Sequence, residues 1–171
     1  MILQLVSYSE DGAVTNMGVD LEPERFVVFV SVISADGSVD QSIIKRTTRE
    51  TNIGSPVYGA PSHIQPYTSL TGSTSVAGAR YSDLDRTPGI FFVFADLSVR
   101  IQGTFRLKCH LIDTQAYVPW GTGNFEGPIP IHTTATSPFT MYSPRNVPKK
   151  PASSALSRLL ASQGAPIHIL N

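Results

Sequence analysis

The residues that could do chemistry are few and widely spaced in this chain. Cys109 is the only cysteine, and the four histidines lack the short spacings of metal-ligand motifs. The histidines are His63, His110, His132 and His168. There is no G-x-S-x-G elbow and no P-loop, and nothing places an acid, a base and a nucleophile together. We therefore interpret the protein as a non-enzyme and expect no cofactor and no metal site.

The single cysteine indicates both a role and a compartment. Cys109 falls on the apolar side of an alternating segment, which favours an inert thiol in the core over a nucleophile. One cysteine cannot form an intramolecular disulfide, and the chain has no Asn-x-Ser/Thr glycosylation acceptor. Both features are typical of the cytosol or the nucleus. No apolar run is long enough to span a bilayer, so we expect a soluble, non-secreted protein without a membrane partner.

Charge is the remaining chemical signal. The 13 Lys and Arg balance the 13 Asp and Glu, so the formal net charge is zero. After Glu126 the chain has no acidic residue but keeps four basic ones, which are Arg145, Lys149, Lys150 and Arg158. A basic C-terminal third indicates contact with an anionic partner, and a solvated surface without a ligand is the alternative.

The elements that must position these groups are strands. The densest strand signal lies in residues 89–113, where residues 90–94 are continuously apolar and predict a strand covered on both sides. Residues 97–102 and 105–111 each alternate apolar and polar, which is typical of strands with one core face and one polar face. Arg100, Arg106 and Lys108 lie on the polar face and are candidates for a partner surface.

The join at residues 102–103 has two interpretations. A two-residue hairpin would place Val99 opposite Arg106 and mix core with solvent residues. A three-residue loop would instead set Arg100 against Arg106, and these two charges repel. We therefore favour a crossing between two packed sheets, as in immunoglobulin-like sandwiches.

The remaining chain predicts a single loop-rich β domain over residues 1–171. Further strands are expected at Ile2–Tyr8, Phe26–Ser34, 39–46, 139–142 and 167–170, with a short edge strand within 68–78 and long loops at 48–87 and 114–136. One helix is expected over 155–163, capped by Ser153 or Ser154 and stopped by Gly164. Residues 144–171 thus form a proline-spaced link, the helix and a final strand.

Several motifs resemble the velvet family of fungal developmental regulators. They are FFVF at 91–94, DLSVR at 96–100, Gly103, FRL at 105–107, SPF at 137–139, Tyr142-Ser143, the stretch 153–164 and ILQL at 2–5. The resemblance covers nearly the whole chain in the right order. It implies a β-sandwich akin to the immunoglobulin-like DNA-binding domains of Rel factors, with a helix near its C-terminal end.

The resemblance also implies a function. Velvet proteins act in the nucleus, with shuttling through the cytoplasm, as homodimers or heterodimers that bind promoter DNA. They govern development, sporulation and secondary metabolism, and some associate with a methyltransferase-like regulator. The family carries a basic segment upstream of the Ile2 strand, which we expect to be absent here. The link at 146–150 also replaces the family's Lys-x-Phe-Pro-Gly pattern.

Three hypotheses follow. In the first, cations in loops contact DNA phosphates. These cations are Lys45, Arg46, Arg49, Arg145, Lys149 and Lys150. In the second, the chain is an interaction subunit that dimerises without binding DNA. In the third, an unrelated sandwich binds a ligand through Trp120 and the tyrosines of the 48–87 segment.

Overall fold

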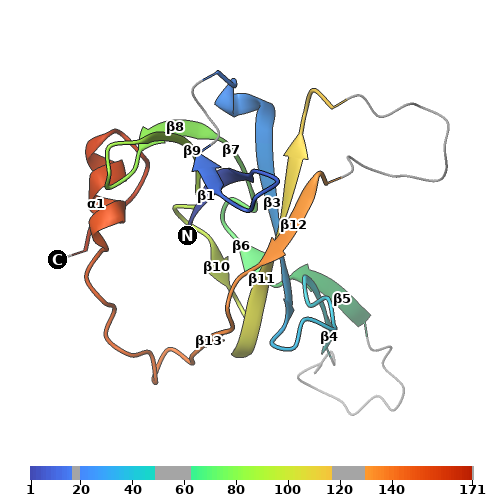
Figure 1. Cartoon of the computed structure of the whole chain (residues 1–171). Coiled ribbons are helices and arrows are strands. Elements are labelled where there is room, and N and C mark those ends of the chain that lie inside the picture. Colours follow the sequence, from blue (N-terminus) through green and yellow to red (C-terminus); the bar gives the residue numbers. More distant parts are fainter. Residues whose placement is uncertain (17–19, 49–62, 117–129, 171) are drawn as a thin grey trace, which may run out of the picture.

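The computed structural model describes residues 1–16, 20–48, 63–116 and 130–170, and Figure 1 shows their arrangement. The strands are β1 (Ile2–Tyr8), β2 (Val14–Asn16), β3 (Phe26–Ser34), β4 (Ile43–Thr48), β5 (His63–Thr68), β6 (Leu70–Thr71), β7 (Ser75–Ala77), β8 (Ala79–Ser82), β9 (Pro88–Val93), β10 (Ser98–Val99), β11 (Gly103–Asp113), β12 (His132–Ala135) and β13 (Phe139–Met141). The helices are the 3-10 turn η1 (Pro23–Arg25) and α1 (Ala155–Ser162). The predicted mainly β fold with one short C-terminal helix is confirmed.

Two antiparallel sheets form the body of the sandwich. One has the strand order β2-β1-β9-β8, and the other has the order β12-β11-β3-β7 with β13 also paired to β11. Apolar residues from both sheets meet in one core, because alternate residues of β3 and β11 face inward, such as Val30, Leu107 and Cys109. No helix in the described part of the chain is long and apolar enough to cross a membrane.

β9 is covered on both faces, as its continuous apolar sequence predicts. Ile90 and Phe92 belong to the core between the sheets, whereas Phe91 and Val93 pack beneath α1. Leu160 of α1 is fully buried in this second cluster. Burial of a leucine side chain contributes about 1.5–3 kcal/mol, so the helix is an integral outer layer.

The predicted change of sheet near Gly103 is confirmed, but the chain comes from a small sheet of β10 and β6 and not from the other large sheet. β10 pairs with β6, whereas β11 pairs with β3, so the two consecutive strands lie in different sheets. Gly103 has a φ of 138°, and a Cβ at this position would lie 2.9 Å from the Phe105 ring. A residue with a side chain would therefore be strained where the chain changes sheet.

Helix α1 begins at Ala155 as predicted and ends at Ser162, one residue before the predicted end. The Ser154 hydroxyl accepts a hydrogen bond from the Ser157 amide at 3.1 Å, which caps the first turn. Gly164, with a φ of 94°, follows the last turn. The Gln163 side chain then bonds both the amide and the carbonyl of Ser82, which ties the helix to the edge strand β8.

Three strand predictions need correction. The strand expected at 39–46 is Ile43–Thr48. The short edge strand expected at 68–78 is confirmed by β7, which pairs with β3 at the edge of its sheet, but the rest of the segment expected as a loop at 48–87 also contains β5 and β8. The final strand predicted at 167–170 is wrong, because the Leu170 amide and carbonyl bond to Ser153 just before α1 and not to a sheet edge. A short apolar segment becomes a strand only where a partner edge is within reach.

Candidate nucleic-acid interface

Strand register defines two ends of the sandwich, and each end holds charged residues of both signs. β11 runs from Gly103, which pairs with Met141, to Asp113, which pairs with Phe26. We call the Asp113 end the acidic end and define it by Asp20, Glu22, Glu24 and Asp113. We call the opposite end the basic end and define it by Lys45, Arg100, Arg145, Lys149 and Lys150. Figure 1 shows β4, β5 and the link after β13 in its lower part.

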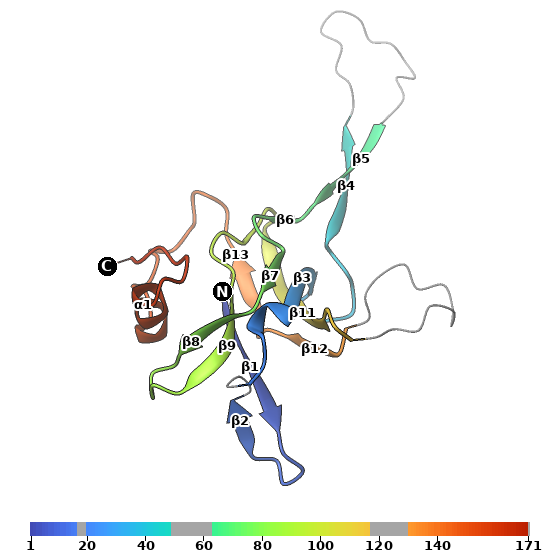
Figure 2. The same cartoon turned by 90° about the horizontal axis from the view of Figure 1, so that it is seen from above.

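The first part of the basic end is an arm formed by β4 and β5. The two strands pair only with each other, and the arm projects from the sandwich in Figure 2. Its root is held by Ser42, whose carbonyl accepts from the Ser69 amide at 2.9 Å and whose hydroxyl accepts from the Val32 amide at 3.1 Å. Lys45 lies on β4 with an exposed side chain. The arm therefore presents a cation to solvent away from the body.

The second part is the link between β13 and α1. Residues 144–152 are all exposed, and they include Arg145, Lys149 and Lys150. Prolines recur at 144, 148 and 151, and proline restricts its own backbone and that of the residue before it. The link starts with a turn at residues 143–146 and is an exposed basic segment without a buried side chain.

The cations of the basic end are not engaged within the protein. In the described ranges, none of the five side chains of the basic end forms an ion pair or a hydrogen bond. Asp36, in the turn after β3, is held by the hydroxyls of Ser34 and Ser38, whose hydrogen bonds lower its pKa to about 2. An anion can therefore approach these cations without displacing a carboxylate.

The structure brings together only part of the predicted set. Lys45 lies on the arm, while Arg145, Lys149 and Lys150 lie on the link, and Figure 1 shows the arm and the link on separate sides of the basic end. Arg46 lies on β4, but its side chain is outside the described part, as is the whole of Arg49. The role of all six residues as DNA contacts remains a prediction from the sequence.

The tertiary structure makes Arg100 a better candidate for contact with DNA than its sequence pattern indicated. It is exposed, and its amide donates to the Ser69 carbonyl at 2.8 Å, beside the root of the arm. This proximity depends on the pairing of β10 with β6, which no local pattern revealed. Arg106 is less available, because its Nε donates to the Ala35 carbonyl at 2.8 Å, and Lys108 is half-buried.

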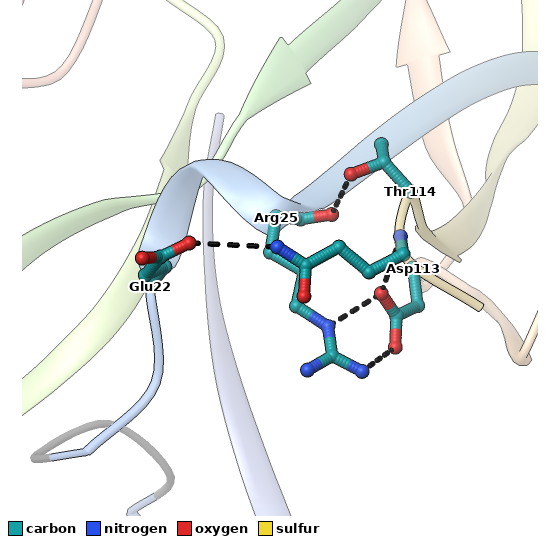
Figure 3. Close-up of polar contacts among 5 residues, drawn as sticks. Glu22, Arg25, Asp113 and Thr114 are labelled. Carbon is teal, nitrogen blue, oxygen red and sulfur yellow. Dashed lines mark hydrogen bonds and ion pairs between the residues drawn. The ribbon is translucent and has the colours of Figure 1, made fainter.

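The acidic end contains an ion pair between Arg25 and Asp113 that sequence analysis missed, and we call this pair the clasp. Arg25 donates to both carboxylate oxygens of Asp113, with an Nε to Oδ1 distance of 2.6 Å (Figure 3). The Thr114 hydroxyl donates to the Arg25 carbonyl at 2.9 Å, which adds a second tie between η1 and the end of β11. The hydrogen bond from Arg25 holds the pKa of Asp113 below its ordinary value, and Asp113 raises the pKa of Arg25.

Other reactive groups lie apart from both ends. Cys109 is buried in the core, and burial raises the pKa of its thiol, which agrees with the predicted inert role. Among the described residues no group of three or more His, Cys, Asp or Glu could hold a metal ion. Trp120 lies outside the described residues.

Comparison with known proteins identifies the family. Residues 47–171 match the family model described as Velvet factor. A velvet complex protein of Coprinopsis cinerea is 38% identical over 122 residues, which are 68% of this chain and 34% of that protein. The spore development regulator RYP2 of Ajellomyces capsulatus is 38% identical over 102 residues, covering 60% of this chain and 25% of the relative.

A third relative comes from a different fungus. The sexual development regulator umv3 of Mycosarcoma maydis is 37% identical over 109 residues, covering 62% of this chain and 26% of the relative. The chain thus spans about a third or less of the length of these curated relatives. The hypothesis of an unrelated sandwich is wrong, because this chain belongs to the velvet family.

Proposed function

We propose that this chain is a nuclear transcription regulator that dimerises and binds promoter DNA to control fungal development, sporulation and secondary metabolism. Membership of the velvet family supports the regulatory part, as do relatives named as regulators of spore or sexual development. The observation that carries the DNA-binding part is the set of exposed cations without protein partners at the basic end.

The cations would act by neutralising phosphates. Lys45 on the arm and Lys149 and Lys150 on the link present flexible ammonium groups, and Arg145 adds a planar guanidinium. Each phosphate contact releases condensed counterions, so affinity falls as salt rises. Arg46 and Arg49, which the sequence also predicts as DNA contacts, would add further phosphate contacts. Such contacts position the protein on a duplex, whereas base contacts supply specificity.

The partners of this function are a second velvet protein and DNA. Five relatives are named as velvet complex subunits, which supports a homodimer or heterodimer here. A methyltransferase-like regulator is a further proposed partner, and the proposed location is the nucleus with shuttling through the cytoplasm. Both follow from the family resemblance.

A second candidate function is a dimerising subunit that does not itself bind DNA. The net charge of zero favours it, because the chain as a whole does not attract a polyanion. The separation of the arm from the link also favours it, since two small clusters hold a duplex less firmly than one continuous surface.

Fluorescence anisotropy with a labelled duplex at several salt concentrations separates the two functions. For a DNA-binding protein we expect log K to fall linearly with log salt, with a slope of about −0.9 per phosphate contact. Lys150→Glu should weaken binding and reduce the slope by about one contact. Unmeasurable affinity at low salt, or affinity indifferent to salt, would contradict DNA binding.

Two controls accompany this titration. Arg158→Glu changes the net charge by the same amount on the exposed face of α1, away from the basic end, and should leave affinity nearly unchanged. Light scattering on a sizing column should give twice the chain mass of 18.5 kDa for the wild type and for Lys150→Glu. A strict monomer at high concentration would contradict the dimer in both candidate functions.

A further inference from the structure

An apolar cavity opens between the two sheets near the acidic end, away from the cations of the basic end. Its volume is about 400 Å³, and its walls come from β1 and β9 on one side and from β3, β11 and β12 on the other. β1 pairs with β9 through residues 2–5 but with β2 only through residues 6–8. The second half of β1 therefore leaves β9, and no other strand of the described part of the chain pairs with β9 beside it on that side.

The depth of the cavity is formed by core residues. Phe26, Phe92 and Cys109 line it, and each is at most 5% exposed. Leu3 and Leu111, on opposite sheets, are half-buried walls. Protein interiors are close-packed and seldom leave voids larger than a water molecule, whereas small-molecule pockets measure about 300–1,000 Å³. The size of this opening is that of a ligand site and exceeds a packing defect.

The lining chemistry restricts the class of ligand. No Asp, Glu, Lys or Arg among the described residues lines the cavity, so a charged molecule would lose hydration without gaining a counter-charge. The polar groups are Gln4, Tyr8, His132 and Thr134, and the last three are exposed at the mouth. A ligand with an apolar body inside the cavity and one hydrogen-bonding group at the mouth would match both the apolar base and the polar rim.

We propose that this cavity binds a neutral, mainly apolar small molecule with a single hydrogen-bonding end. The apolar part lies against Leu3, Phe92 and Leu111, and the polar end remains at His132 and Thr134. A concave site with buried core residues at its base fits a compact molecule better than a flat protein surface. This site is independent of the basic end, so it does not depend on DNA binding.

The register of β12 supplies a matched pair of variants. Thr134 lies opposite Cys109 and lines the cavity, whereas Ala135 lies opposite Lys108 on the outer face of the same strand. Both residues are exposed, so a larger side chain at either position does not overfill the core. Thr134→Trp should fill the cavity, and Ala135→Trp should add the same indole on the other face.

The first measurement is a titration of the full chain with N-phenyl-1-naphthylamine, a neutral probe that fluoresces in apolar sites. We expect saturable binding with one site per chain in the wild type and in Ala135→Trp, and at least tenfold weaker binding in Thr134→Trp. Circular dichroism of the three proteins verifies that they are folded. The absence of saturable binding in the wild type, or equal binding in Thr134→Trp, would overturn the proposal.

The second measurement follows Cys109 as a reporter at the base of the cavity. A bound molecule should slow alkylation of its thiol by iodoacetamide, about elevenfold when the probe is at ten times its Kd. An unchanged rate at saturation contradicts binding at this site. Light scattering tests another occupant: a wild-type dimer that becomes monomeric in Thr134→Trp would show that a second copy fills the groove, which would also overturn the proposal.

Discussion

The two ends of the sandwich use their charged residues in opposite ways. At the acidic end Arg25 lies against Asp113 and joins η1 to the last residue of β11. At the basic end Lys149 and Lys150 extend from a proline-spaced link into solvent, without a partner among the described residues. A cation that faces a carboxylate across a strand pair stabilises the fold, whereas one on an exposed link is available for a ligand.

The contrast shows why residue type alone does not identify a binding site. Arg25 and Arg145 carry the same guanidinium, but only Arg145 is exposed and without an ion pair in the described ranges. The two acids differ in the same way: Arg25 binds the carboxylate of Asp113, whereas serine hydroxyls bind the carboxylate of Asp36. The environment of each charge therefore decides whether it serves stability or binding.

The largest expected effect comes from reversing the charges of the basic end. The variant Lys45→Glu, Arg145→Glu, Lys149→Glu and Lys150→Glu should lose DNA affinity on the order of 100-fold or more at low salt, because phosphate contacts become repulsive. Its unfolding free energy should change little, since these side chains are exposed and form no ion pair or hydrogen bond among the described residues. Anisotropy and urea denaturation measure the two quantities.

The control for this variant reverses two charges at the other end. Asp20 and Glu24 are exposed at the acidic end. The double variant Asp20→Lys and Glu24→Lys should keep DNA affinity within a fewfold of the wild type. If this double variant strengthens binding as much as the basic-end variant weakens it, affinity follows net charge and the division between the ends fails.

The next effect concerns the clasp. Asp113→Ala should lower the unfolding free energy, because it leaves Arg25 without its acceptor and removes a hydrogen bond to the Gln115 amide. Asp20→Ala, at an exposed position of the same end, should change it by no more than about 0.5 kcal/mol. Equal urea midpoints for the two variants would mean that the clasp does not stabilise the fold.

Lowering the pH should have a smaller effect on the unfolding free energy, through one carboxylate at each end of the sandwich. Asp113, beside Arg25, and Asp36, beside Ser34 and Ser38, have a folded pKa below the ordinary value, about 2 for Asp36. The folded state then binds fewer protons than the unfolded state, so this stabilisation is complete above the unfolded pKa of about 3.9 and is lost as pH falls through the folded pKa. Urea denaturation at pH 6, 4 and 3 should show the unfolding free energy decreasing. Asp113→Asn should reduce that decrease, and an identical pH dependence in this variant would contradict the contribution of Asp113.

The smallest expected effect on DNA affinity concerns the carboxylate of Asp36 at the basic end. Asp36→Asn removes an exposed negative charge from the turn after β3, at the basic end, and should raise DNA affinity by no more than about twofold at low salt, since solvent screens exposed charges. Anisotropy with Ser38→Ala, which keeps the carboxylate, is the control. A tenfold increase in Asp36→Asn would show that this carboxylate directly opposes bound DNA.

Much of the fold could be predicted because it follows from local patterns. Ile2–Tyr8 and Phe26–Ser34 are strands at the predicted bounds, and the mismatch of faces at Gly103 correctly indicated a change of sheet. Alternation, turn residues and caps act over a few residues, so the sequence records them directly. The segment at 167–170 failed because its strand-like composition had no sheet edge beside it.

The candidate site was less predictable. Lys149 and Lys150 were identified from composition, but their exposure and the position of Arg100 beside the arm required the tertiary structure, including the pairing of β10 with β6. The cavity was not foreseen, because its lining residues alternate like ordinary core positions and only the departure of β1 from β9 leaves them open.

By itself the sequence determined a β-sandwich with a capped C-terminal helix, the velvet resemblance and an excess of cations in its last third. Only the tertiary structure decided which charges are paired and which are available. Arg25 and Asp113 are 88 residues apart and meet because antiparallel pairing of β3 with β11 sets Phe26 opposite Asp113. Such register links distant residues through backbone hydrogen bonds and burial of a shared face, which no local pattern of charge records.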